Sequence, residues 1–260
     1  MIRGLWTRET VALMLLAAYL PLALFWVSYE GTAAAERFGL AALVLAIWSL
    51  VFMLARAQPP SLATVVTALA IAMLAPEGLG IFKLALGISF GAVMGELVFG
   101  GWGRNVVNPA TVALSFLGFG FPGYAWPGFV EPVVWAAIPA ALVGMATGVM
   151  PVAVILGAGL VAVAANLSGM LPGSMLPVAG IVLVLLVADP ATSAATTVSR
   201  WLNGALYAGL VTLFATGWDG AAEVQIAVAA ALLTSLAVPL LDEAAVALWI
   251  AGRRRRHGRI

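Results

Sequence analysis

Long apolar runs recur along the whole chain, separated by short polar stretches or stretches rich in glycine and proline. A transmembrane helix needs about 20 apolar residues, with a range of about 17 to 25. On this basis the sequence predicts ten helices, with eight or nine as the alternative count. They cover residues 10–28, 38–55, 61–75, 80–99, 109–121, 133–149, 151–165, 175–188, 202–216 and 224–251. The segments 109–121 and 175–188 are short enough to be broken or half helices.

The composition shows which solvent these helices face. Of the 260 residues, 63% are hydrophobic and 9% are charged, whereas a soluble domain has about 25% charged residues. Apolar side chains can face outward in lipid, so we expect an all-α, polytopic membrane protein. The first apolar run is interpreted as a helix, not as a signal peptide, because it is long and lacks a small-residue cleavage site. We expect a single transmembrane domain over residues 1–260, with a first half of about 1–130, a second half of about 131–252 and a basic tail at 253–260.

The placement of charge predicts an orientation in the inner (cytoplasmic) membrane. If both termini are cytoplasmic and ten helices follow, ten of the twelve Lys and Arg residues lie on the cytoplasmic side, as the positive-inside rule expects. These ten are Arg3, Arg8, Arg56, Arg104, Arg200, Arg253, Arg254, Arg255, Arg256 and Arg259. The basic tail has two interpretations, a nucleic-acid patch or an anchor beside anionic lipid. We favour the anchor and expect no nucleic-acid partner.

A short motif occurs twice. Asn108-Pro109-Ala110-Thr111 recurs as Asp189-Pro190-Ala191-Thr192, and each copy follows an apolar run. Paired, proline-interrupted segments in two halves of a membrane protein indicate inverted repeats with a binding site at their interface. We therefore expect two inverted repeats, with broken helices meeting at that interface.

The first polar centre is the glycine-rich stretch before the first copy of the motif. Its glycines allow tight turns and a close approach of the backbone, and its two asparagine amides each offer donors and an acceptor. If the stretch is helical, the two amides share one face. Asn108 before Pro109 also fits a helix N-cap, so a capped loop without a ligand is the alternative. The candidate residues are Gly101, Gly103, Asn105 and Asn108.

The second polar centre is Asp189 with the hydroxyl residues after it. Asp189 follows residues 180–188, which have no polar side chain. An ionisable residue inside a membrane is costly and indicates function, although an N-cap ahead of Pro190 would also explain it. Thr192 and the hydroxyls beyond it are expected to line a polar pocket or a helix interface. We expect no metal site and no catalytic residue in this chain.

Other redox carriers are restricted by composition. The chain has no cysteine and a single histidine, His257, so iron–sulfur ligation and bis-histidine haem ligation within the chain are excluded. Glu96, near the end of an apolar run, is interpreted as a cation or proton site or as an interfacial side chain. Lys83 is interpreted as interfacial.

Two stretches resemble a known family. Residues 85–101, continuing through Asn108-Pro109-Ala110, closely resemble the NqrB subunit of the sodium-translocating NADH:quinone reductase and its relative, the RnfD subunit of the Rnf electron-transport complex. The Asp189-Pro190-Ala191 stretch, residues 204–209, residues 229–239 and Asp242 are similar to later parts of the same NqrB/RnfD family. The resemblance extends from about residue 62 to the C-terminus.

This resemblance implies ten helices in two inverted repeats and electron transfer through flavins. It implies a non-covalent flavin, riboflavin or FMN, hydrogen-bonded by Asn105 and Asn108 with Asp189 opposite. Family members also carry FMN esterified to a threonine in a Ser/Thr-Gly-Ala-Thr motif between the two halves. Residues 122–132 contain no serine or threonine, so no covalent flavin is expected here. We therefore expect redox partners, namely an extracytoplasmic flavinylated protein and a cytoplasmic donor, with a flavoprotein or quinone as acceptor.

Two other functions fit the same sequence. A transporter or channel for a small solute or ion fits an inverted-repeat fold equally well, because a fold does not determine a function. A scaffold for redox subunits would bind no flavin and carry no flux.

Overall fold

The computed structural model describes residues 7–57 and 59–257, where all regular structure is helical. Arg3 and Arg259, used in the charge argument, lie outside these residues. The first half contains α1 (Arg8–Glu30), α2 (Thr32–Arg56), α3 (Ala63–Leu74), α4 (Gly80–Gly95), the 3₁₀ turn η1 (Leu97–Phe99) and α5 (Pro109–Gly120). The second half contains α6 (Glu131–Trp135), α7 (Ala137–Ala146), α8 (Val152–Leu167), α9 (Met175–Val182), the π-helical η2 (Leu183–Val187), α10 (Thr197–Gly217) and α11 (Glu223–His257).

The lengths of the helices fit a polytopic membrane protein with interrupted spans. Among the described residues, four helices are long and apolar enough to cross a membrane, namely Arg8–Glu30, Thr32–Arg56, Gly80–Phe99 and Glu223–Ala251. The shorter apolar helices are Ala63–Leu74, Pro109–Gly120, Glu131–Ala146, Val152–Leu167 and Met175–Val187. At about 1.5 Å per residue, a helix of 12 residues reaches only part of the way across a core of roughly 30 Å. Each predicted segment contains a helix, so the all-α polytopic class is confirmed.

Several boundaries differ from the prediction. α2 begins at Thr32 and not near 38, and α10 begins at Thr197 and not near 202. In both cases the first helical turns carry polar residues, which an apolar run excludes although the backbone is helical. The predicted helix 133–149 is interrupted at Ala136, because Pro139 has no N–H to donate to the carbonyl of residue 135.

The order of helix contacts recurs in the two halves. In the first half α4 packs against α2 and α5, and α3 packs against α5. In the second half α10 packs against α8 and α11, and α9 packs against α11. Contacts between the halves join corresponding helices, α1 with α7 and α5 with α11. This recurrence supports a division near residue 130, which stays a prediction.

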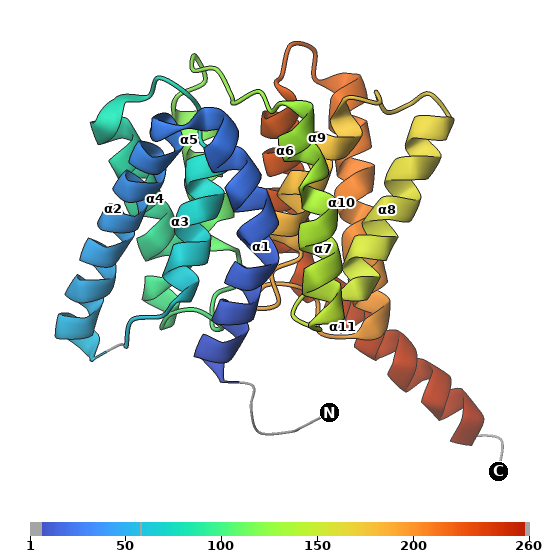
Figure 1. The fold of residues 1–260 in the computed structure, drawn as a ribbon. Helices are drawn as coiled ribbons and strands as arrows, with labels where there is room; N and C mark the ends of the chain where they lie inside the picture. Colours follow the sequence, from blue (N-terminus) through green and yellow to red (C-terminus); the bar gives the residue numbers. More distant parts are fainter. Residues whose placement is uncertain (1–6, 58, 258–260) are drawn as a thin grey trace.

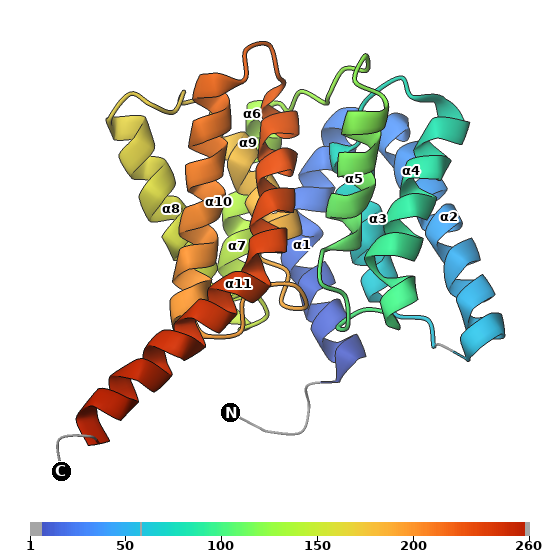
Figure 2. The same ribbon diagram turned by 180° about the vertical axis from the view of Figure 1, so that it is seen from behind.

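Corresponding helices also run in opposite directions. The described ends of the chain lie on the same side of the bundle, which we call the terminal side (Figure 1). The helices α1, α3 and α5 run away from the terminal side, and α7, α9 and α11 run towards it (Figures 1 and 2). This arrangement is what an inverted repeat requires.

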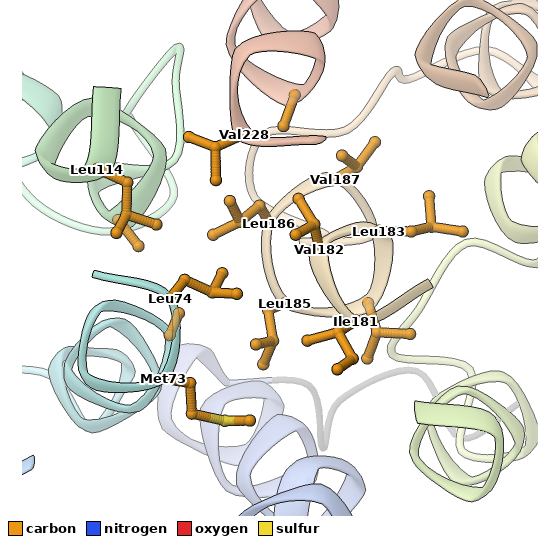
Figure 3. Close-up of a cluster of buried hydrophobic side chains, with 14 of the residues drawn as sticks. Met73, Leu74, Leu114, Ile181, Val182, Leu183, Leu185, Leu186, Val187 and Val228 are labelled. Carbon is orange, nitrogen blue, oxygen red and sulfur yellow. The ribbon is translucent and has the colours of Figure 1, made fainter. Parts of the chain in front are cut away.

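An apolar core fills the space where the two halves meet. Met73 and Leu74 at the end of α3, Leu114 of α5, Leu185 of η2 and Val228 of α11 converge there (Figure 3). All five side chains are buried. The polar groups of the candidate site therefore lie beside a packed apolar centre.

Candidate flavin site at the Asn108–Asp189 junction

A ladder of glycines on α4 sets the position of α5. A methyl group added at Gly91 would lie 2.5 Å from Cβ of Ala113 and 2.6 Å from the carbonyl oxygen of Pro109. One added at Gly95 would lie 2.8 Å from Cα of Pro109. Real Cβ contacts are not this short, so only glycine permits this separation of the helices. The ladder predicted from small-xxx-small spacing thus brings the start of α5, with Asn108, against α4.

The glycine-rich stretch before α5 is a loop, not a helix. Gly100, Gly101 and Gly103 have φ of 104°, 92° and 89°, a region that residues with a Cβ rarely adopt. The Asn105 side chain closes this loop on itself, because its Oδ1 accepts from the N–H of Gly103 at 3.0 Å and its Nδ2 donates to the carbonyl of Val107 at 3.3 Å. The interpretation that Asn105 and Asn108 share a helical face is therefore wrong.

Asn108 caps α5 as the sequence predicts. Its Oδ1 accepts from the backbone N–H of Ala110 at 2.9 Å and of Thr111 at 3.4 Å, and Pro109 occupies the first helical turn. These N–H groups have no partner within the helix. The cap uses the oxygen of the amide and leaves its nitrogen free to donate elsewhere.

Asp189 is reached through the distorted helix η2. The N–H of Ala188 bonds to the carbonyl of Leu183 at 2.8 Å, whereas in an α-helix it would bond to that of Val184. The hydroxyl of Tyr19, on α1, donates to this released Val184 carbonyl at 2.9 Å. Both Tyr19 and Val184 are buried. Tyr19 thus satisfies the carbonyl that the π-helical turn leaves without a partner, and π turns often occur at functional sites.

Replacing Tyr19 with phenylalanine is expected to destabilise the protein more than the same change at Tyr207. Tyr207 donates to the carbonyl of Ala179 at 2.9 Å, but that carbonyl also accepts from the N–H of Leu183. Tyr19→Phe leaves the Val184 carbonyl without a partner, which costs about 1–3 kcal/mol. Thermal unfolding of both variants in detergent measures the difference, and equal midpoints would contradict this role of Tyr19.

Asp189 caps a turn and not a helix. Its Oδ1 accepts from the N–H of Ala191 at 3.0 Å, and its own carbonyl accepts from Ser193 at 3.0 Å. The next helix, α10, begins at Thr197 with Thr196 as its N-cap. The alternative that Asp189 is an N-cap ahead of Pro190 is therefore wrong, because residues 190–196 form a turn that separates the carboxylate from the helix.

The two polar centres meet at these residues. Nδ2 of Asn108 donates to Oδ2 of Asp189 at 2.9 Å, across 81 residues of sequence. The hydroxyl of Thr192 donates to the same oxygen at 3.3 Å. Asn108, Asp189 and Thr192 are 6%, 4% and 6% exposed, so the carboxylate is held by neutral donors in a site removed from solvent. We call these three residues the junction.

The other candidate residues lie in the loop before the junction. No hydrogen bond of the described structure joins the side chain of Asn105 to the junction, because its amide groups bond within the loop. Gly101 lines a small recess with Arg8 and Glu96, and Gly103 is exposed. The structure thus brings together Asn108, Asp189 and Thr192.

Asp242 of α11 braces the turn that carries Asp189. Its carboxylate accepts from the N–H of Ala195 at 2.9 Å and from the N–H of Thr196 at 3.1 Å. The hydroxyl of Ser199 donates to the carbonyl of Leu241 at 3.2 Å. These bonds fix the segment between the junction and α10 to the middle of α11.

Replacing Asp242 with alanine is expected to loosen this segment. The change leaves two backbone N–H groups without their acceptor, a loss comparable to that of a helix cap, about 1–2 kcal/mol. The neighbouring Glu243→Ala is the matched control, because Glu243 is exposed. Hydrogen exchange at residues 190–197 measures the effect, and unchanged protection in Asp242→Ala would contradict the brace.

Two hydroxyls on α5 lack partners. Thr67, Thr212 and Thr234 donate to the carbonyl four residues earlier in their own helices. By contrast, the hydroxyl oxygens of Thr111 and Ser115 are buried without a hydrogen-bond partner. Both lie on the face of α5 that Asn108 begins, at spacings of three and seven residues. A buried polar group without a partner needs an explanation, and a ligand bonded beside the junction is one.

A third group without a partner belongs to α10. Asn203 is 1% exposed, and its Oδ1 has no hydrogen-bond partner. Its Nδ2 makes a long bond of 3.5 Å to the hydroxyl of Ser193, in the turn after Asp189. The sequence shows Asn203 only as a polar residue inside a helix, and no motif distinguished it.

The two charged residues of α4 and its end have different surroundings. Glu96 is 7% exposed, so it is a buried group and not an interfacial one, and Asp189 and Arg8 lie near enough to interact with it electrostatically. Lys83 donates to the hydroxyl of Tyr124 and lies 5.6 Å from the ring centroid of Phe121. Lys83 therefore has a structural role in holding the loop after α5.

Comparison with known proteins identifies the class of the chain. A sequence model of the NQR2, RnfD, RnfE family matches residues 2–141, which include α1 to α5 and the junction residue Asn108. The chain therefore belongs to the NQR2, RnfD, RnfE family, a membership that the resemblance in its motifs predicted.

Three relatives share part of the sequence, and each is the NqrB subunit of a Na⁺-translocating NADH-quinone reductase. The chain is 40% identical over 80 residues to that of Yersinia pestis, covering 31% of this chain and 19% of the relative. It is 40% identical over 75 residues to that of Pseudomonas paraeruginosa, covering 29% and 19%. The match to that of Haemophilus influenzae is 37% over 79 residues, covering 30% and 19%. The chain thus matches about a fifth of the length of these relatives.

Proposed function

We propose that the chain is a membrane subunit of a flavin-based electron-transfer complex, with a non-covalently bound riboflavin or FMN beside the junction. The observation that carries the proposal is the buried hydrogen bond between Asn108 and Asp189 at 2.9 Å. It unites the two signature segments in one site, and the family and the relatives' names associate such a site with a redox complex.

The residues present fit the chemistry of a flavin ring. The isoalloxazine edge offers mixed donors and acceptors, and the site has groups of both kinds without partners, the Thr111 hydroxyl and Oδ1 of Asn203. Asn108 and Asp189 bond directly to each other, so a ligand would use the second N–H of the Asn108 amide and would not lie between the two side chains. A bound flavin supplies one- and two-electron chemistry, and hydrogen bonds to its ring tune its potential.

This arrangement assigns different roles to the candidate residues. Asn108 orients the ligand and caps α5, Asp189 holds the amide of Asn108, and Thr192 fixes the carboxylate. Gly101, Gly103 and Asn105 shape the loop through which the ring approaches. The apolar side chains around the junction exclude water from it.

The placement of charge supports an orientation with the terminal side in the cytoplasm. Arg8, Arg56, Arg200 and Arg253 lie near the ends of their helices on the terminal side (Figure 1). This is the side that the positive-inside rule assigns to the cytoplasm of an inner membrane. Electrons would then enter from a cytoplasmic donor and leave towards an extracytoplasmic flavoprotein or a quinone.

A solute channel is the less favoured function. The space where the two halves meet is filled by buried apolar side chains of α3, η2, α5 and α11 (Figure 3). Such packing suits insulation around a cofactor better than a polar route for a solute. Flux of a labelled solute through proteoliposomes, without any bound flavin, would favour the channel.

Transmembrane electron transfer tests the proposal. Proteoliposomes loaded with ferricyanide and exposed to external dithionite should reduce ferricyanide faster when they contain the flavin-loaded protein. Liposomes containing Asp189→Leu, matched for protein content, are the control. Equal rates for the wild type, the variant and protein-free liposomes would contradict an electron-transfer role.

A further inference from the structure

The last part of α11 leaves the helix bundle. Up to Val238 the helix has many buried side chains, but from Leu240 to Ala251 none is buried. The change follows Pro239, which lies inside the helix and removes a backbone hydrogen bond where helices commonly bend. Beyond it the helix slants away from the bundle on the terminal side (Figures 1 and 2). We call residues 240–253 the arm.

The arm is apolar and has no cover within the described part of the chain. Leu240, Leu248 and Trp249 are 69%, 71% and 62% exposed, and in helical projection they point in different directions. A helix that is apolar all round belongs in a non-aqueous environment. The whole of α11 has 35 residues, about 52 Å at 1.5 Å per residue, which is longer than a hydrocarbon core of roughly 30 Å. The arm therefore extends to the level of the lipid headgroups.

The charge of the arm suits an anionic surface. The guanidinium of Arg253 lies 5.0 Å from the centre of the Trp249 ring, and the sequence continues with Arg254, Arg255 and Arg256. Tryptophan and arginine gather where a membrane meets water, and clusters of basic residues there attract anionic lipids. The acidic residues of the arm, Asp242 and Glu243, lie at its root.

The root of the arm is fixed to the bundle. Asp242 accepts from the backbone N–H groups of Ala195 and Thr196, and the carbonyl of Leu241 accepts from Ser199. These bonds attach both residues after Leu240 to the start of α10. The direction of the arm is thus set by the bundle, and the arm reaches the same depth in every molecule.

From these observations we propose that the arm lies in the membrane interface on the terminal side and binds anionic lipid headgroups. Its leucines and Trp249 enter the boundary of the acyl chains, as in interfacial helices. The arginines that follow pair with lipid phosphates. This inference does not depend on the proposed redox function, since it rests on residues that take no part in the junction.

A single fluorescent label tests the proposal, because the chain has no cysteine. Leu248→Cys is labelled with an environment-sensitive dye and placed in nanodiscs of phosphatidylcholine with or without phosphatidylglycerol. We expect blue-shifted emission and protection from iodide quenching with phosphatidylglycerol. Both effects should be lost when Arg253, Arg254, Arg255 and Arg256 are changed to glutamine.

Phe82→Cys is the matched control, because Phe82 is 91% exposed at the start of α4, far from the arm. Its label should respond equally in both lipid mixtures and should ignore the arginine changes. Two results would overturn the proposal. One is a water-exposed label at residue 248 in both mixtures, and the other is a label equally shielded in both, as expected if a second copy or a protein partner covers the arm.

Discussion

Replacing Asn108 with leucine is expected to destabilise the protein by roughly 3 kcal/mol or more. The change removes the cap of α5, worth about 1 kcal/mol, and leaves the buried carboxylate of Asp189 without its amide donor. Breaking a buried polar pair by removing one partner is costly, about 3–5 kcal/mol where both groups are charged. Thermal unfolding and size-exclusion profiles in mild detergent measure the loss.

Asn105→Leu is the matched control in the same loop. The Asn105 amide bonds only to Gly103 and Val107 in the described structure, so its loss should cost clearly less. The double variant Asn108→Leu/Asp189→Leu should be less destabilised than the sum of the two single changes, because the second change removes the stranded carboxylate. Additive losses, or equal losses at residues 105 and 108, would contradict the junction.

Replacing Gly204 with alanine is expected to prevent correct packing of α8 against α10. The added methyl group would lie 2.0 Å from the carbonyl oxygen of Val154 and 2.7 Å from the backbone nitrogen of Ala158. Both are backbone atoms, so α8 must shift as a whole, and overpacking costs about 1–3 kcal/mol or more. The yield of monodisperse protein and its thermal midpoint should both fall.

The same substitution at Gly209 controls for the chemical change. Gly209 lies in the same helix, and an added methyl group there meets nothing within 4 Å. Since alanine is favoured over glycine inside a helix by about 1 kcal/mol, Gly209→Ala should leave stability unchanged or raise it. If both variants behaved alike, the close approach of α8 and α10 would not be what Gly204 permits.

The fold was largely predictable from apolar runs, and the reason is physical. In lipid each backbone polar group must bond within its own segment, so a long apolar run is a helix. The same argument fails for segment ends, where Thr32 and Thr197 begin helices with polar turns. It also fails for the π-helical turn at Leu183–Val187, because a run of apolar side chains does not determine which carbonyl each N–H chooses.

The candidate site was predictable in part. The Asn-Pro pattern indicated a cap at Asn108, and the apolar run before Asp189 made that carboxylate conspicuous. The contact between them depends on how helices pack, which one sequence does not contain. Tyr19 and Asn203 went unnoticed for a related reason. A tyrosine in an apolar helix and an amide in α10 gain meaning only from their neighbours, the carbonyl of Val184 and the turn after Asp189.

The flavin content of the purified chain tests the central claim most directly. Protein extracted in mild detergent should release riboflavin or FMN on acid denaturation in an amount stoichiometric with the chain. Asn108→Leu and Asp189→Leu, compared at equal amounts of folded protein, should release much less, while Glu243→Ala should match the wild type. A wild-type protein without flavin, or junction variants that retain all of it, would contradict a flavin site at Asn108 and Asp189.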